Sequence, residues 1–182
     1  DTRCGAPTRD HWAGTWSMAQ IDNAAQKHVM FTYGPTDAQR DAVPLLRRGA
    51  GSYLYDDEGK AFLDWTSQAV CANLGHTVPA SVKEAIMTQL DTLPYVYGGL
   101  GLVEPRARLA ALLGELLPAD LNGFLFPSSG AEANEAAIRI ARQYTGRSKV
   151  LTRYRSYHGG TANSLAATGD FRRHFAEAGT SG

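Results

Sequence analysis

The sequence has little cysteine, no net charge and no long hydrophobic run. Its two cysteines, Cys4 and Cys71, lie too far apart to suggest a disulfide framework or a metal-binding cluster, and they suit a reducing compartment. Its 18 basic and 18 acidic side chains cancel, which argues against nucleic-acid binding, because that role needs a basic excess. No stretch approaches the roughly 20 apolar residues of a membrane span. The composition therefore predicts a protein without nucleic-acid, membrane or metal partners.

What is present is typical of a globular protein, with 43% hydrophobic and 20% charged residues in 182. This length suits one domain or a piece of a larger one. The chain starts at Asp1 rather than at Met, with no leader-like segment, and it stops shortly after a helix-like stretch, 171–178. We therefore expect the sequence to be a fragment.

The first half of the chain predicts a helix, a hairpin and a second helix. Residues 1–27 are polar, and Trp12 and Trp16 are four residues apart, which suits one or two helical turns. Two short apolar segments, 53–55 and 61–63, flank turn residues and predict a β-hairpin. Pro79 then starts a helix that Thr77 caps, with Val82, Ile86 and Leu90 at four-residue steps.

The second half predicts alternating helices and strands. Pro105 opens a helix that ends before Pro118, and four leucines on one stripe mark its apolar face: Leu109, Leu112, Leu113 and Leu116. The apolar segment 124–126 predicts a buried strand, 131–144 a helix, and 149–153 another strand. A strand, a helix and a strand in about 30 residues form a βαβ unit, so we expect a parallel sheet in an α/β fold.

The turn before the third helix has the chemistry of an anion site. Serine and glycine at 128–130 leave hydroxyl and backbone N–H groups at a helix N-terminus, where the helix dipole is positive. Gly130 lets the backbone approach a phosphate closely. The residues alone nevertheless favour a simpler interpretation, in which Ser128 or Ser129 only caps the helix.

Other phosphate and nucleophile motifs do not fit. The Gly59-Lys60 pair lacks the earlier glycine of a P-loop, and the glycines at 98–101 do not lie between a strand and a helix. No serine has the G-x-S-x-G pattern of a hydrolase. A second candidate segment, 153–160, follows the last predicted strand, at the sheet end where ligands bind. Tyr157 offers a flat face there to a planar cofactor, although an ordinary loop tyrosine explains it equally well.

Four segments occur together in order, and the set resembles the class III pyridoxal-phosphate-dependent aminotransferases. They are YLYDDEGKAFLDW (53–65), NLGHTVPASVKEAI (73–86), FPSSGAEANEAAIRIARQYTGR (126–147) and YRSYHGGT (154–161). The resemblance covers most of residues 31–168, and it is strongest to ω-amino-acid and taurine–pyruvate-like members. It implies the fold-type I architecture, a three-layer α/β/α large domain with a smaller domain. Residues 1–27 would be an N-terminal extension, 28–92 the first part of the small domain, and 93–182 the start of the cofactor-binding large domain.

The resemblance also implies roles for individual residues. Pyridoxal 5′-phosphate would be held by Ser129, Gly130 and Ala131 at its phosphate, by Tyr157 stacked on its ring, and by Gly159, which leaves clearance. The substrate pocket would include Tyr33, Trp65 and Tyr97, with Val70 as a weaker candidate; Trp65, Val70 and Tyr97 could equally be core residues. We interpret His76, His158 and Glu132 as structural.

The family's Schiff-base lysine and its acid at the pyridine nitrogen have no counterpart in this sequence. Lys27, Lys60, Lys83 and Lys149 do not have the position of that lysine, which family members carry downstream of Tyr157, and Arg153 and Arg155 are not the family's substrate-carboxylate arginine. We therefore expect this fragment alone to be inactive.

The resemblance implies that the full protein moves an amino group from an ω-amino acid or amine to an oxo acid such as pyruvate, by a ping-pong Schiff-base mechanism. It would act as a homodimer in the soluble interior of the cell, in the cytoplasm or a mitochondrion. Two alternatives stay open. One is a mutase or decarboxylase of the same fold, and the other is a non-catalytic truncated chain that pairs with a full-length relative.

Overall fold

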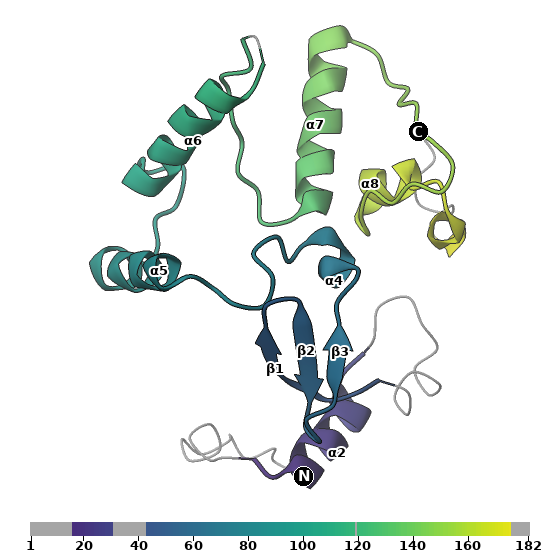
Figure 1. Ribbon diagram of the computed structural model, residues 1–182. Coiled ribbons are helices and arrows are strands. Elements are labelled where there is room, and N and C mark those ends of the chain that lie inside the picture. Colours follow the sequence, from purple (N-terminus) through teal and green to yellow (C-terminus); the bar gives the residue numbers. More distant parts are fainter. Residues whose placement is uncertain (1–15, 31–42, 119, 176–182) are drawn as a thin grey trace, which may run out of the picture. The chain divides into compact units, whose positions relative to one another are not determined.

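The computed structural model describes residues 16–30, 43–118 and 120–175, and the chain divides into two compact units (Figure 1). The first unit is Asp1–Pro94 and the second is Tyr95–Gly182. The division lies two residues beyond the predicted boundary at 92/93, and the assignment of the parts to a small and a large domain stays a prediction.

The first described element is helix α2, Met18–His28. Ser17 caps it: the Ser17 hydroxyl accepts from the Gln20 N–H at 3.3 Å, and the Gln20 side chain accepts from the Ser17 N–H at 2.8 Å. Lys27 and His28 occupy the last turn, where positive charge suits the helix dipole. The helix therefore begins after Trp16 rather than around it, and Trp12 lies outside the described residues.

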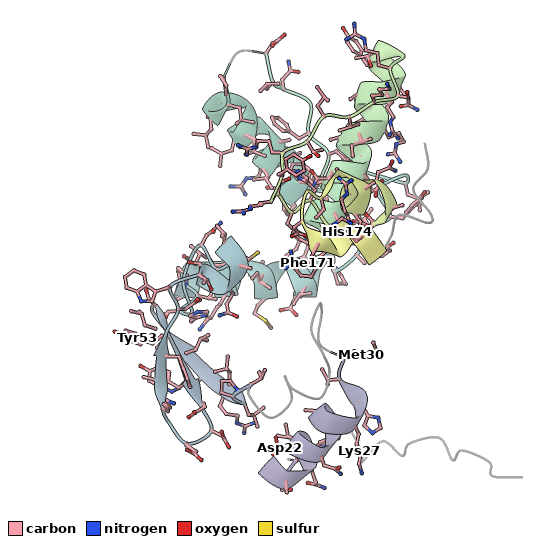
Figure 2. All side chains as sticks on the ribbon, turned by 90° about the vertical axis from the view of Figure 1, so that its right-hand side faces the viewer. Asp22, Lys27, Met30, Tyr53, Phe171 and His174 are labelled. Carbon is pink, nitrogen blue, oxygen red and sulfur yellow. The ribbon has the colours of Figure 1, made fainter. Side chains whose placement is uncertain are left out.

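A three-stranded antiparallel sheet follows, in the order β1-β2-β3 (Figure 1). The predicted hairpin is confirmed as β2 (Tyr53–Asp56) and β3 (Ala61–Leu63), and Figure 2 marks Tyr53 at the start of β2. Asp56 stabilises the hairpin turn, because its carboxylate accepts from the N–H groups of Glu58 and Lys60. Strand β1 (Leu46–Ala50) was not predicted, since LRRGA has no alternation of apolar and polar residues.

The next element, α4 (Ser67–Val70), is a turn of left-handed backbone. All four residues have positive φ, between 48° and 68°, and none is glycine. Left-handed backbone brings Cβ too close to the carbonyl oxygen and costs roughly 1–2 kcal/mol per residue. Asp64 supports this turn, because its Oδ1 accepts from the Gln68 N–H at 3.2 Å and from the N–H and hydroxyl of Thr66, both at 3.2 Å.

The other oxygen of Asp64 contacts His76, whose Nε2 lies 2.8 Å away. We call Asp64, Thr66, Gln68 and His76 the Asp64 cluster. Burial of the Asp64 carboxylate raises its pKa, but the hydrogen bonds from His76, Gln68 and Thr66 outweigh burial and lower the pKa to about 2. The carboxylate therefore stays charged while it holds the left-handed turn.

Helix α5, Ala80–Thr92, confirms the helix predicted from Val82, Ile86 and Leu90. The predicted cap is wrong, because Pro79 itself occupies the N-cap position and makes no side-chain cap bond. The Thr77 hydroxyl instead accepts from the Gly51 N–H at 2.8 Å, so it joins this segment to the turn between β1 and β2.

The second unit contains α6 (Glu104–Leu116), α7 (Gly130–Thr145), α8 (Ala162–Ala167) and the 3₁₀ helix η1 (Phe171–Phe175). Helices α6 and α7 confirm the predictions. Figure 1 shows α8 beside α7, and Figure 2 marks Phe171 and His174 on η1. Ala136, Ser164 and Thr168 are the buried non-glycine residues of the described part of the chain, and all three belong to α7, α8 or the residue that ends α8.

The two strands predicted around α7 are not strands. Residues 124–126 and 149–153 have no regular structure, and neither pairs with a strand within the described part of the chain. A parallel strand needs a hydrogen-bonding neighbour and covered faces, whereas Leu125 is 63% exposed and Leu151 98% exposed. The local βαβ prediction is therefore wrong for these segments.

Candidate functional site

The N-terminus of α7 is capped by the serine that the sequence singled out. Ser129 is the N-cap, and its hydroxyl oxygen accepts from the Glu132 N–H at 3.2 Å. Glu132 in turn accepts from the Ser128 N–H at 2.7 Å. Ser129 uses an oxygen lone pair in this cap, so its O–H is still able to donate to an anion. The capping and anion-binding interpretations are therefore compatible in one side chain.

Two backbone donors at this helix end have no acceptor among the described residues. They are the N–H groups of Gly130 and Ala131, the first two helical positions, which have no partner within a helix. No atom lies within 4 Å of a Cβ added at Gly130, so the space beside this backbone is open. With the positive end of the α7 dipole, these donors form a site whose chemistry suits a phosphate group.

The loop at 155–160 packs directly against this helix end through Gly159. Gly159 is buried and has φ +136°, and a Cβ there would lie 2.6 Å from the Cβ of Ala131 and 3.0 Å from that of Ser164. Only glycine allows this approach. The structure thus brings Gly159 together with Ser129, Gly130 and Ala131, four of the five residues expected to bind the cofactor.

Tyr157, the fifth, lies in the same loop, and its backbone is held through the next residue. The His158 N–H donates to the Thr168 hydroxyl at 3.0 Å, and the His158 carbonyl accepts from the Asn134 side chain at 2.7 Å. The Tyr157 ring is 53% exposed, and the Arg172 guanidinium lies 5.2 Å from its centroid, within range of a cation–π interaction. The ring is therefore both oriented and accessible.

A carboxylate that the sequence analysis missed lies behind this loop. Glu135, one turn into α7, accepts hydrogen bonds from three residues at the start of α8: Thr161, Asn163 and Ser164. We call these four residues the Glu135 cluster. Burial raises the pKa of Glu135, but the bonds from Thr161, Asn163 and Ser164 prevail and lower it to about 2. One sequence signal was present, because Glu135 is four residues after Ala131 and so shares its helix face.

The expected substrate residues belong to both units, and each is described within its own unit. In the first unit, Trp65 lies just before α4 and Val70 is its last residue, and they are 87% and 82% exposed. Tyr97 is in the second unit, 63% exposed, with its ring against Gly99. Tyr33 lies outside the described residues. Their place in a substrate pocket stays a prediction.

The described residues show neither a metal-binding cluster nor a membrane-spanning helix. Residues 16–30, 43–118 and 120–175 contain no group of three His, Cys, Asp or Glu side chains that could hold a metal ion. In the same residues, no helix combines the length and the apolar character needed to cross a membrane.

Comparison with known proteins gives one consistent result. Residues 36–180 match the family model "Aminotransferase class-III". An uncharacterized aminotransferase of Bacillus subtilis, YodT, is 41% identical over 140 residues, which are 74% of this chain and 31% of that protein. An acetylornithine aminotransferase of Oceanobacillus iheyensis is 41% identical over 133 residues, covering 70% of this chain and 32% of the relative. The chain thus spans about a third of the length of these curated relatives.

Solved structures agree with the family model. An (S)-enantioselective omega-transaminase from Thermomicrobium roseum superposes with a TM-score of 0.78 at 36% identity, over 86% of this chain and 37% of its own. A taurine:2-oxoglutarate aminotransferase from Bifidobacterium kashiwanohense, in complex with PLP and glutamate, also gives 0.78, at 34% identity, over 93% of this chain and 37% of its own. The similarity therefore extends from the sequence to the fold.

Proposed function

The chain belongs to the class III aminotransferases, and we propose on this basis that its complete protein transfers an amino group from a donor to an oxo acid with pyridoxal 5′-phosphate. By the complete protein we mean the full product of the reading frame that contains residues 1–182. The chain has the α/β fold of the fold-type I transaminases, as expected, and covers about 37% of those structures. Because it is so much shorter, the activity belongs to the complete protein.

The observation that supports cofactor binding is the pair of N–H groups at Gly130 and Ala131, which have no acceptor among the described residues. Beside them lies the 155–160 loop, which approaches α7 closely because residue 159 is glycine. In this proposal these two N–H groups and the Ser129 hydroxyl bind the phosphate. Tyr157 stacks on the cofactor ring, and Gly159, which has no side chain, lets the 155–160 loop lie against Ala131 and leaves clearance on the side of the ring. When bound, pyridoxal 5′-phosphate supplies an electron-accepting ring that stabilises charge developing on the substrate carbon. The chain's own residues bind and orient it.

The proposed donors are ω-amino acids or amines, and the proposed acceptor is an oxo acid such as pyruvate. The structures named as an omega-transaminase and as a taurine:2-oxoglutarate aminotransferase support the choice of donor, and the second also has an oxo acid, 2-oxoglutarate, in its name. Relatives named acetylornithine aminotransferase share the amino transfer and differ in the donor. We place Tyr33, Trp65 and Tyr97 in the substrate pocket, with Val70 as a further candidate. The Schiff-base lysine and the acid that pairs with the ring nitrogen would belong to residues outside 1–182, and we expect a homodimer in the cytoplasm.

The test is amino transfer by the complete protein, with a matched pair of variants. Purified protein is freed of cofactor, titrated with pyridoxal 5′-phosphate, and assayed with ω-amino donors and with N-acetylornithine, using pyruvate or 2-oxoglutarate as acceptor. Gly130→Asp places a negative charge at the α7 N-terminus, which suits the helix but repels a phosphate. Gly101→Asp is the control, because a Cβ at either glycine meets no atom within 4 Å.

We expect Gly130→Asp to raise the Kd for the cofactor at least a hundredfold without loss of stability, and Gly101→Asp to change neither. Cofactor binding that survives Gly130→Asp would remove the α7 site from the proposal. A wild-type protein that decarboxylates or rearranges the amino donor, without forming an amino acid from pyruvate or 2-oxoglutarate, would overturn the proposed reaction.

A further inference from the structure

We propose that Glu135 is a positioning residue that fixes the Tyr157 loop relative to the phosphate-binding end of α7, and thereby sets the affinity for pyridoxal 5′-phosphate. This inference rests on the proposed function, since it concerns the same cofactor. The hydrogen bonds of the Glu135 carboxylate go to residues at the start of α8 rather than to the groups proposed to hold the cofactor. Glu135 acts through α8, in three steps that the hydrogen bonds define.

The first step is that Glu135 caps a helix other than its own. The N-cap of α8, Thr161, makes no side-chain cap bond. Instead, Oε1 of Glu135 accepts from the Thr161 hydroxyl at 2.7 Å and from the N–H groups of Asn163 and Ser164 at 2.8 and 3.1 Å. Oε2 accepts from the Asn163 side-chain amide at 2.8 Å. A residue of α7 therefore satisfies the donors that open α8, and so fixes the start of α8 on α7.

The second step leads from α8 to both parts of the site. The Ser164 hydroxyl donates to the carbonyl of Ala131 at 2.9 Å, in the first turn of α7. The Thr168 hydroxyl donates to the Ser164 carbonyl at 2.9 Å and accepts from the His158 N–H at 3.0 Å. Ser164 and Thr168 are both fully buried, so water does not compete for these bonds. A shift of α8 would therefore move His158 relative to Ala131.

The third step is a second anchor for the Tyr157 loop, at the carbonyl of His158. Asn134, the neighbour of Glu135, donates to the His158 carbonyl at 2.7 Å. Both backbone groups of His158 are thus held by α7, the carbonyl directly through Asn134 and the N–H through Glu135 and α8. His158 lies between Tyr157 and Gly159, so the two residues proposed to meet the cofactor ring are anchored by this pair.

The four donors around Glu135 require a carboxylate rather than its amide. A glutamine has one acceptor oxygen, and its NH₂ group would face at least one of the donors from Thr161, Asn163 or Ser164. The low pKa of Glu135 agrees with this, because the same hydrogen bonds favour the ionised form. Glu135→Gln therefore disturbs α8 while keeping the volume of the side chain.

The test separates the two ends of the cofactor. In the complete protein, freed of cofactor, the Kd is measured for pyridoxal 5′-phosphate and, separately, for inorganic phosphate, which needs only the α7 end. We expect Glu135→Gln to raise the Kd for pyridoxal 5′-phosphate about tenfold and to leave the Kd for inorganic phosphate within twofold. The visible circular dichroism of the bound cofactor should also weaken, because that signal reports how the ring is held. Glu115→Gln, an exposed carboxylate of α6, is the control and should change none of these.

Equal affinity of Glu135→Gln and wild type for pyridoxal 5′-phosphate would overturn the inference. An equal loss of affinity for pyridoxal 5′-phosphate and for inorganic phosphate would also overturn it, because it would indicate a general disturbance of the second unit. If Glu135→Gln does not fold, Thr161→Val decides, because it keeps the carboxylate and removes the hydrogen bond from the Thr161 hydroxyl to Oε1 of Glu135. It should raise the Kd for the cofactor about threefold and not that for phosphate, and no change would contradict the inference. A wild-type protein that binds no pyridoxal 5′-phosphate would instead overturn the proposed function, so the two failures are distinguishable.

Discussion

Each unit of the chain uses one carboxylate to hold a short helical segment, but the two carboxylates reach over different stretches of sequence. Asp64 accepts from residues 2 to 12 positions away. Glu135 accepts from residues 26 to 29 positions away. The pKa of each lies at about 2, because hydrogen bonds outweigh burial in both. Similar electrostatics therefore serve a local turn in one unit and a long-range junction in the other.

This difference predicts which residues a substitution in each cluster will affect. The Asp64 cluster shapes one continuous stretch, so a change there should stay near α4. The Glu135 cluster joins segments separated by a long loop, whose ordering costs conformational entropy that the contacts at the junction must offset. A change there should affect the loop and helix that the junction holds, residues 155–168, which include Tyr157 and Gly159.

The largest effect is expected from a substitution that separates the 155–160 loop from α7 in the second unit. Gly159→Ala places a methyl group 2.6 Å from the Cβ of Ala131 at a backbone φ of +136°, so the loop must move off α7. We expect a loss of about 3 kcal/mol in the free energy of unfolding of the complete protein, measured by urea denaturation. Gly59→Ala, in the hairpin turn of the first unit, is the control, because its φ is +84° but no atom lies within 4 Å. It should cost only about 1 kcal/mol, and equal losses would show that close packing at Gly159 is unimportant.

An intermediate effect compares the two carboxylates by pH. Each has a folded-state pKa of about 2, below the ordinary values of 3.8 for Asp64 and 4.5 for Glu135, so the unfolded chain binds more protons in this range. Their stabilisation is complete above about pH 4.5 and is lost as the pH falls toward 2. Peptide-resolved hydrogen exchange on the complete protein should show this loss near both clusters. Asp64→Asn should remove the pH dependence only in residues 64–76 and Glu135→Gln only in 155–168, and a shared response would contradict the separation.

The smallest effects are expected at Ser129, where two substitutions separate its role as helix cap from its proposed role in phosphate binding. Ser129→Ala removes the helix cap and should cost about 1 kcal/mol of stability, whereas Ser129→Gly should cost only a few tenths. Both variants remove the hydroxyl proposed to meet the phosphate, so both should raise the Kd for pyridoxal 5′-phosphate by the same few-fold factor. A Kd that follows stability instead would mean that Ser129 only caps α7.

The parts of the fold that the sequence predicted are those with local causes. Prolines and apolar spacing marked α5 and α6, and the glycine-containing turn marked the hairpin of β2 and β3. The sequence also located the α7 N-terminus with its serine cap. Segments 124–126 and 149–153 failed as strands because apolar character predicts burial only where neighbours exist to provide it.

The missed elements depend on distant partners or on unusual backbone. Helix α8 has only six residues and is capped by Glu135, 26 or more positions away. The neighbouring sequence therefore does not contain the residue that stabilises its start. The turn Ser67–Val70 has none of the glycine or asparagine that marks left-handed backbone. The comparison with known proteins established the family, whereas the role of Ser129 in binding the phosphate is a proposal that Ser129→Ala and Ser129→Gly test.

The left-handed turn of α4 also bears on how this stretch can vary during evolution. It is the mirror image of an ordinary helical turn, so the usual ranking of amino acids is reversed there: alanine, the best helix former, is strained at Ala69, and glycine would be relaxed. Neutral drift should therefore enrich glycine and asparagine at these four positions. A β-branched residue such as Val70, held at φ +68°, is the least expected there, and its persistence in descendants would record selection on its shape.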